Sequence, residues 1–176
     1  MAIKKIVLAM AISAAFTAGV ANAADQGHGS VQFQGSIIDA PCSITSDTAN
    51  QTVDLGDVAN SALKSGQTST PKTFEIKLDQ CDTSTLNTVQ ATFTGGTDTN
   101  DNSLLALNGD AKGAGIAIED SSSALVKFDG KTPTSSQTLQ DGSNTLTFTA
   151  YVKSDGASEV IPGQFTSTAN FSLKYN

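Results

Sequence analysis

Residues 164–176 alternate apolar and polar side chains. Five apolar residues of this segment share one parity and would lie on one face of a β-strand: Phe165, Ala169, Phe171, Leu173 and Tyr175. No turn signal and no further strand-like run follow them in this sequence. We therefore expect this strand to belong to a sheet that lacks a neighbouring strand on one side.

A second alternating segment, Gly29–Gly35, lies near the N-terminus and has no evident hairpin partner. Val31 and Phe33 point to one face of this segment, and Gly27 and Gly29 share their parity. A sheet that misses a strand and a spare strand on the same chain together suggest a subunit that joins copies of itself.

The other strand-like runs are short and are separated by clusters of Gly, Asn, Asp and Ser. They are residues 35–39 with a continuation to Ile44, and residues 51–55, 72–79, 89–93, 104–107, 115–119, 125–128 and 146–152. No helical period persists after the first 23 residues. The pattern predicts a single all-β domain, a β-sandwich with exposed polar loops at residues 60–70 and 131–138.

Residues 1–23 have the composition of a signal peptide. Lys4 and Lys5 precede an apolar stretch, residues 6–20, and Ala21–Ala23 forms a small-residue cleavage site. A membrane anchor is the alternative, but the apolar stretch is too short to span a bilayer comfortably. Loss of the two lysines changes the formal net charge from −7 to −9, which disfavours nucleic acid and anionic membranes as partners.

The chain has two cysteines, Cys42 and Cys81. Export places them in an oxidising compartment, where a disulfide is the expected state and two free buried thiols are the alternative. A bridge that closes about 40 residues contributes roughly 4 kcal/mol of stability by loop-entropy arithmetic. A metal site is less favoured, because the single histidine, His28, is far from both cysteines in sequence.

No arrangement of residues points to catalysis. His28 lies in a polar N-terminal stretch without a nucleophile held beside it, and no pair of carboxylates is spaced for glycoside hydrolysis. Asp98–Asn102 looks like the start of a calcium loop, but Ser103 stands where the loop needs Gly and Gly109 where it needs Glu. We expect a solvated turn there, no enzyme activity, no cofactor and no metal.

In this order the features resemble the pilin subunits of the chaperone–usher class, close to the major rod subunits of type 1 and P-like fimbriae of Gram-negative bacteria. The signal peptide is followed by an N-terminal extension, residues 29–42, and by an early pair of cysteines, Cys42 and Cys81. Gly163 is fourteenth from the C-terminus, and an aromatic residue, Tyr175, is penultimate. The resemblance covers the whole chain.

The resemblance implies an incomplete immunoglobulin-like β-sandwich that lacks its last strand and is completed in trans by donor-strand exchange. Its parts would be a signal peptide (1–23), a donor-strand extension (24–35) and a pilin domain (36–176), with a disulfide between Cys42 and Cys81. The implied donor residues are Gly27, Gly29, Val31 and Phe33, and the implied acceptor residues are Gly163, Phe165, Ala169, Phe171, Leu173 and Tyr175.

The implied function is that of a structural subunit which polymerises into the fimbrial rod on the bacterial surface and supports adhesion. Its partners would be other copies of itself, neighbouring fimbrial subunits, a periplasmic chaperone and an outer-membrane usher, without nucleic acid or a direct membrane anchor. Two alternatives remain at this point: a minor adaptor or adhesive subunit of the same fibre, and an exported enzyme on a β-sandwich.

Overall fold

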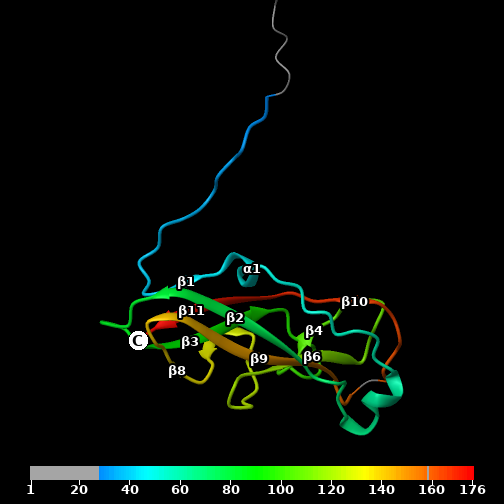
Figure 1. The fold of residues 1–176 in the computed structure, drawn as a ribbon. Helices are drawn as coiled ribbons and strands as arrows, with labels where there is room; N and C mark the ends of the chain where they lie inside the picture. The colour runs from blue at the N-terminus through cyan, green and yellow to red at the C-terminus, as the bar shows by residue number, and fades with distance from the viewer. Residues whose placement is uncertain (1–27, 158) are drawn as a thin grey trace, which may run out of the picture. The chain divides into compact units, whose positions relative to one another are not determined.

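A computed structural model describes residues 28–157 and 159–176 of the chain, drawn in colour in Figure 1. The expected signal peptide and Gly27 lie outside the described residues. The chain divides into one unit that ends at Ile37 and a second unit, Ile38–Asn176. The described part of the first unit contains no helix or strand, and its Val31 and Phe33 side chains are exposed.

Antiparallel sheets form the second unit. The five-stranded sheet has the order β1 (Ser43–Ile44), β2 (Lys72–Cys81), β9 (Gly142–Ser154), β6 (Ala114–Glu119) and β4 (Leu105–Ala106). The opposing sheet has the order β11 (Ala169–Tyr175), β3 (Thr88–Gly95) and β7 (Asp129–Pro133), and β8 (Gln137–Thr138) also pairs with β3. Two short strands, β10 (Phe165–Thr166) and β5 (Asn108–Gly109), form a separate pair. The predicted all-β sandwich is confirmed.

The core lies between these two sheets and follows from the alternation along their strands. On β2, Ile76 and Leu78 are buried whereas the residues between and beside them are exposed. Phe148 of β9 stacks on Phe74 of the neighbouring strand, with ring centroids 5.4 Å apart. It also packs edge-to-face with Phe93 from the opposing sheet, with ring centroids 5.2 Å apart. These contacts join the two layers at the centre of the sandwich.

Two short helices interrupt the sandwich, and the sequence did not predict either. They are α1 (Ser46–Ala49) and the 3₁₀ helix η1 (Asn60–Gly66). Each is too short to show the repeated apolar period of a longer helix. Leu63 of η1 is buried against Ala114 and Val152, which form a second, smaller apolar cluster. Within the described residues, no helix is long and apolar enough to cross a membrane.

Three predicted strands are wrong in part. Only Ser43–Ile44 of the run from residue 35 forms a strand, residues 51–55 are extended without a strand partner, and residues 125–128 make a single bridge. Conversely, the predicted loop at 131–138 contains the last three residues of β7 and all of β8. The Asp129 carboxylate stabilises the start of β7, because it accepts hydrogen bonds from the backbone N–H groups of Lys131 and Thr132, both at 2.8 Å. Those bonds lower the pKa of Asp129 to about 2.

The predicted disulfide is present. Cys42 and Cys81, 39 residues apart in sequence, are bonded and buried, with Cα atoms 4.1 Å apart. The bond fastens the chain just before β1 to the last residue of β2, and the Asp82 amide donates to the Pro41 carbonyl beside it at 2.9 Å. Among the described residues, no group of three or more His, Cys, Asp or Glu side chains is placed to hold a metal.

Candidate strand-binding groove

β11 has a strand partner on only one side. It pairs with β3 from Ala169↔Gly95 to Tyr175↔Val89, and no other described strand pairs with it. Asn176 and Thr88 exchange two backbone hydrogen bonds, of 3.0 and 3.1 Å. Because bonded and non-bonded pairs alternate in an antiparallel ladder, four residues turn their N–H and C=O groups toward the open side. These residues are Ala169, Phe171, Leu173 and Tyr175.

The same residues are only half buried. Val89, Ala91 and Phe93 of β3 are at most 2 % exposed, whereas the β11 residues opposite them remain partly accessible. Phe171 approaches Phe93 with ring centroids 6.2 Å apart, so one side of its ring packs on the core. Partial burial also raises the pKa of Tyr175 above its usual value. The apolar face of β11 therefore lacks cover on its open side.

A second extended segment faces this open side. Residues 52–58, here called the rim segment, belong to no helix or strand. Val53, Leu55 and Val58 are half buried, and the first two show the alternation that predicted a strand. The backbones of Val53 and Leu55 make no hydrogen bond to any described residue. The predicted strand at 51–55 is thus an extended segment without a ladder.

Two adjoining cavities, of about 740 and 680 Å³, lie between the rim segment and the run from Val160 to Phe171. Figure 1 shows the two sides as the cyan chain that follows α1 and the orange-to-red chain through β10 and β11. The cavity walls between them are mostly apolar, with Leu63, Phe74, Phe93, Leu105, Leu107, Ala114, Ile116, Ile118, Ala150 and Val152. We call this space the groove; it is an apolar trough flanked by two extended backbones with unpaired groups.

The segment leading into β11 is hydrogen-bonded to the chain around β5. The Asp110 amide donates to the Gln164 carbonyl at 2.9 Å, and Lys112 and Ile161 exchange backbone hydrogen bonds. Gly163 lies between these contacts, where an added Cβ would stand 2.6 Å from the Ala111 nitrogen. The position therefore needs glycine because two backbones approach too closely for a side chain.

The predicted C-terminal strand is divided in two. The predicted strand runs from Gln164 onward, but the structure separates β10 from β11 at Ser167 and Thr168, where polar Ser167 interrupts the apolar positions. The Ser167 hydroxyl donates to the Ala106 carbonyl at 2.7 Å, at the point where β10 leaves β5 and β11 joins β3. Both parts still direct their apolar side chains toward the main core.

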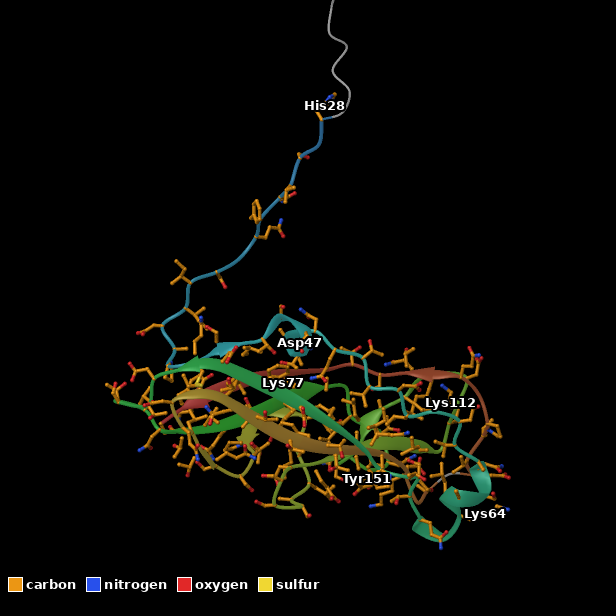
Figure 2. All side chains as sticks on the ribbon, in the orientation of Figure 1. His28, Asp47, Lys64, Lys77, Lys112 and Tyr151 are labelled. Carbon is orange, nitrogen blue, oxygen red and sulfur yellow. A yellow bond between two sulfur atoms is a disulfide. The ribbon has the colours of Figure 1, made fainter. Side chains whose placement is uncertain are left out.

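The predicted acceptor residues line one side of the groove or continue it. Gly163 and Phe165 border the larger cavity, Ala169 and Phe171 border the smaller one, and Leu173 and Tyr175 extend the same face of β11. The rim segment, on the opposite side of the groove, was not predicted as part of the site. The alternation of Val53 and Leu55 was the one sequence feature that pointed to it. His28 lies on the extended chain of the first unit (Figure 2).

Replacing Gly163 by alanine tests the close approach. We expect Gly163→Ala to lower the free energy of unfolding by about 1–3 kcal/mol, because neighbouring backbone must shift to admit a methyl group. Gly96→Ala is the matched control, since nothing lies within 4 Å of a Cβ there. Urea denaturation of both variants measures the difference. Equal stability of the two would contradict the packing described at Gly163.

Comparisons with known proteins agree on one family. The sequence profile of a family described as "Fimbrial protein" matches residues 31–176. The chain is 52 % identical to the Fimbria A protein of Serratia marcescens and 46 % identical to the Major MR/P fimbria protein of Proteus mirabilis, each match covering 99 % of both chains. It is similar to the crystal structure of the P pilus rod subunit PapA, with a TM-score of 0.71 and 33 % identity, over 78 % of this chain and 100 % of that one.

Proposed function

The chain belongs to the fimbrial protein family, and from this premise we propose that its groove accepts the N-terminal extension of another copy. It is a structural subunit of a fimbrium on the cell surface, with an immunoglobulin-like sandwich. The observation that carries the proposal is an apolar trough with an extended backbone on either side, each with N–H and C=O groups that are not hydrogen-bonded. An extended strand inserted between them could pair with both, as in other cases of strand addition to a sheet edge.

The donor in this proposal is the extension, residues 24–35. Val31 and Phe33 share one parity and would bury their side chains in the groove, each contributing about 1.5–3 kcal/mol. Their exposure in the first unit leaves both side chains accessible to a second copy. Gly29 and Gly27 continue the parity without side chains, which would let the donor backbone approach closely. Each main-chain hydrogen bond formed adds about 0.5–1.5 kcal/mol.

An open apolar strand edge promotes unwanted association, so the subunit needs cover before it is assembled. We propose that a periplasmic chaperone supplies a temporary strand to the same groove, and that an outer-membrane usher is the place where the extension of the next subunit replaces it. Within the fibre we favour a rod position over an adaptor position, because the relative from Proteus mirabilis is named a major fimbria protein and the structural neighbour is a rod subunit.

Assembly of fimbriae on cells tests whether the two faces of the extension have different roles. We expect Phe33→Ser to abolish fimbriae seen by electron microscopy, because the groove loses its largest apolar occupant. Gln32→Ser is the matched control: it changes the neighbouring side chain, which points to the other face, and should leave fimbriae normal. Immunoblotting of the periplasm checks that both subunits are made. Normal fimbriae in the Phe33→Ser strain would refute the donor assignment.

A further inference from the structure

The chain between β1 and the rim segment is attached to the edge of β2 by one backbone hydrogen bond, from the Thr45 amide to the Lys77 carbonyl at 3.0 Å, and then by side-chain hydrogen bonds. β1 pairs with only two residues of β2, through Ser43↔Asp79 and Ile44↔Leu78. Farther along, the edge of β2 at Lys77 and Glu75 faces α1 and the residues that follow it. Asp47 of α1 and Lys77 of β2 lie along this seam (Figure 2).

Two side chains bond to the β2 edge where the ladder stops. The Thr48 hydroxyl accepts the Lys77 amide hydrogen at 3.1 Å, and the Gln51 side-chain amide donates to the Glu75 carbonyl at 2.9 Å. The same Gln51 amide nitrogen donates to the Thr48 carbonyl at 3.2 Å, which ties the two residues together. Thr48 is buried, with 6 % of its surface exposed. We call these bonds the β2 clamp.

The β2 clamp fixes one end of the rim segment. Gln51 directly precedes it, and buried Leu63 holds η1 beyond its other end. Within the rim segment itself, the only hydrogen bond described to a backbone group is that of the Gly56 amide with the Asp54 carboxylate, 2.9 Å, which is local. The direction in which Val53 and Leu55 present their backbone groups therefore depends on Gln51 at one end, together with the packing of Leu55 and Val58 on the apolar clusters.

An incoming strand binds faster when the edge it must pair with is already extended, because ordering a mobile edge costs conformational entropy. We propose that Gln51 and Thr48 are positioning residues, which hold the rim segment ready to pair before the donor strand arrives. This inference rests on the proposed function of the groove. Gln51 and Thr48 act on residues 52–58 indirectly, through the β2 clamp. The clamp is present without the donor strand.

The test compares two matched amide-to-acid changes in the full mature chain. Gln51→Glu keeps the shape of the side chain but removes the N–H donated to Glu75. Asn144→Asp does the same at a site that lines neither cavity, where the Asn144 amide donates to the Gln140 carbonyl at 2.7 Å. Both are made in a background with Val31→Ser and Phe33→Ser, so that the chain's own extension does not compete. Stopped-flow fluorescence then measures the association rate of a labelled peptide of residues 25–38.

We expect Gln51→Glu to slow association about fivefold, the effect of one lost hydrogen bond, while Asn144→Asp stays within twofold of the background. The melting temperatures of the two unliganded variants should be similar, which separates positioning from general stability. Thr48→Val should slow association as well, and Thr48→Ser, which retains the hydroxyl, should restore it. Equal rates for Gln51→Glu and Asn144→Asp would overturn this inference alone. Failure of the background chain to take up the peptide would overturn the proposed function and this inference with it.

Discussion

A synthetic peptide of residues 25–38 raises the melting temperature of the mature chain by about 5–10 °C when added at roughly a hundredfold excess over its Kd. A ligand at that excess stabilises the folded state by about 2.7 kcal/mol. One kcal/mol shifts the melting temperature of a chain of this size by about 2–4 °C. The chain carries Val31→Ser and Phe33→Ser so that its own extension stays out of the groove.

The control peptide has the same composition with Gln32 and Phe33 exchanged. This puts the two large apolar side chains on opposite faces of the strand, so no register can bury both, and we expect a clearly smaller rise in melting temperature. Differential scanning calorimetry gives both values. Equal stabilisation by the two peptides would mean that nonspecific apolar binding, and not strand insertion, explains the shift.

Removing the disulfide has an effect of similar size. We expect the double variant Cys42→Ser, Cys81→Ser to lose about 4 kcal/mol of unfolding free energy, because the unfolded chain gains the freedom of an open loop of about 40 residues. The bond also anchors the start of β1 to the end of β2, beside the seam that carries α1. Urea denaturation of the variant and of the oxidised chain measures the difference.

Reduction of the wild-type disulfide under native conditions serves as the control for this variant, because it opens the same loop without changing the sequence. The two forms should unfold at similar urea concentrations. A loss below about 1 kcal/mol in both would contradict the view that this bond is a principal source of stability in the sandwich.

The long strands could be predicted from the sequence because each buries one face. β2, β3, β9 and β11 show apolar residues at every second position, and the face that each strand turns to the core follows from that alternation. The parity that predicted the acceptor face of β11 depends on the same signal. The disulfide followed from a different premise, the oxidising compartment that an exported chain enters.

Other features had no comparable signal. β7 and β8 are mostly polar and partly exposed, so they resemble loops in sequence. The strand predicted at 115–119 is present as β6, but it is buried on both faces, since Leu104 covers the side opposite the core next to Gly115, and its residues therefore do not alternate between apolar and polar. For that reason the sequence did not show that Ile116 and Ile118 form part of the groove wall.

The rim segment shows how alternation can predict an extended chain without specifying its partner. Val53 and Leu55 have the pattern of a strand, but the described chain provides no neighbour to which their backbones bond. Pattern alone could not show that this segment and β11 lie on opposite sides of one space. That relation depends on contacts among residues far apart in sequence, which only the folded structure brings together.

Amide hydrogen exchange of the chain with and without the 25–38 peptide tests the groove most directly. We predict that the peptide protects the amides of Phe171 and Leu173 together with amides of the rim segment, because an inserted strand bonds to both edges. Ser172 is an internal reference, since its amide already faces β3. Unchanged exchange on both edges in the presence of bound peptide would contradict strand insertion into the groove.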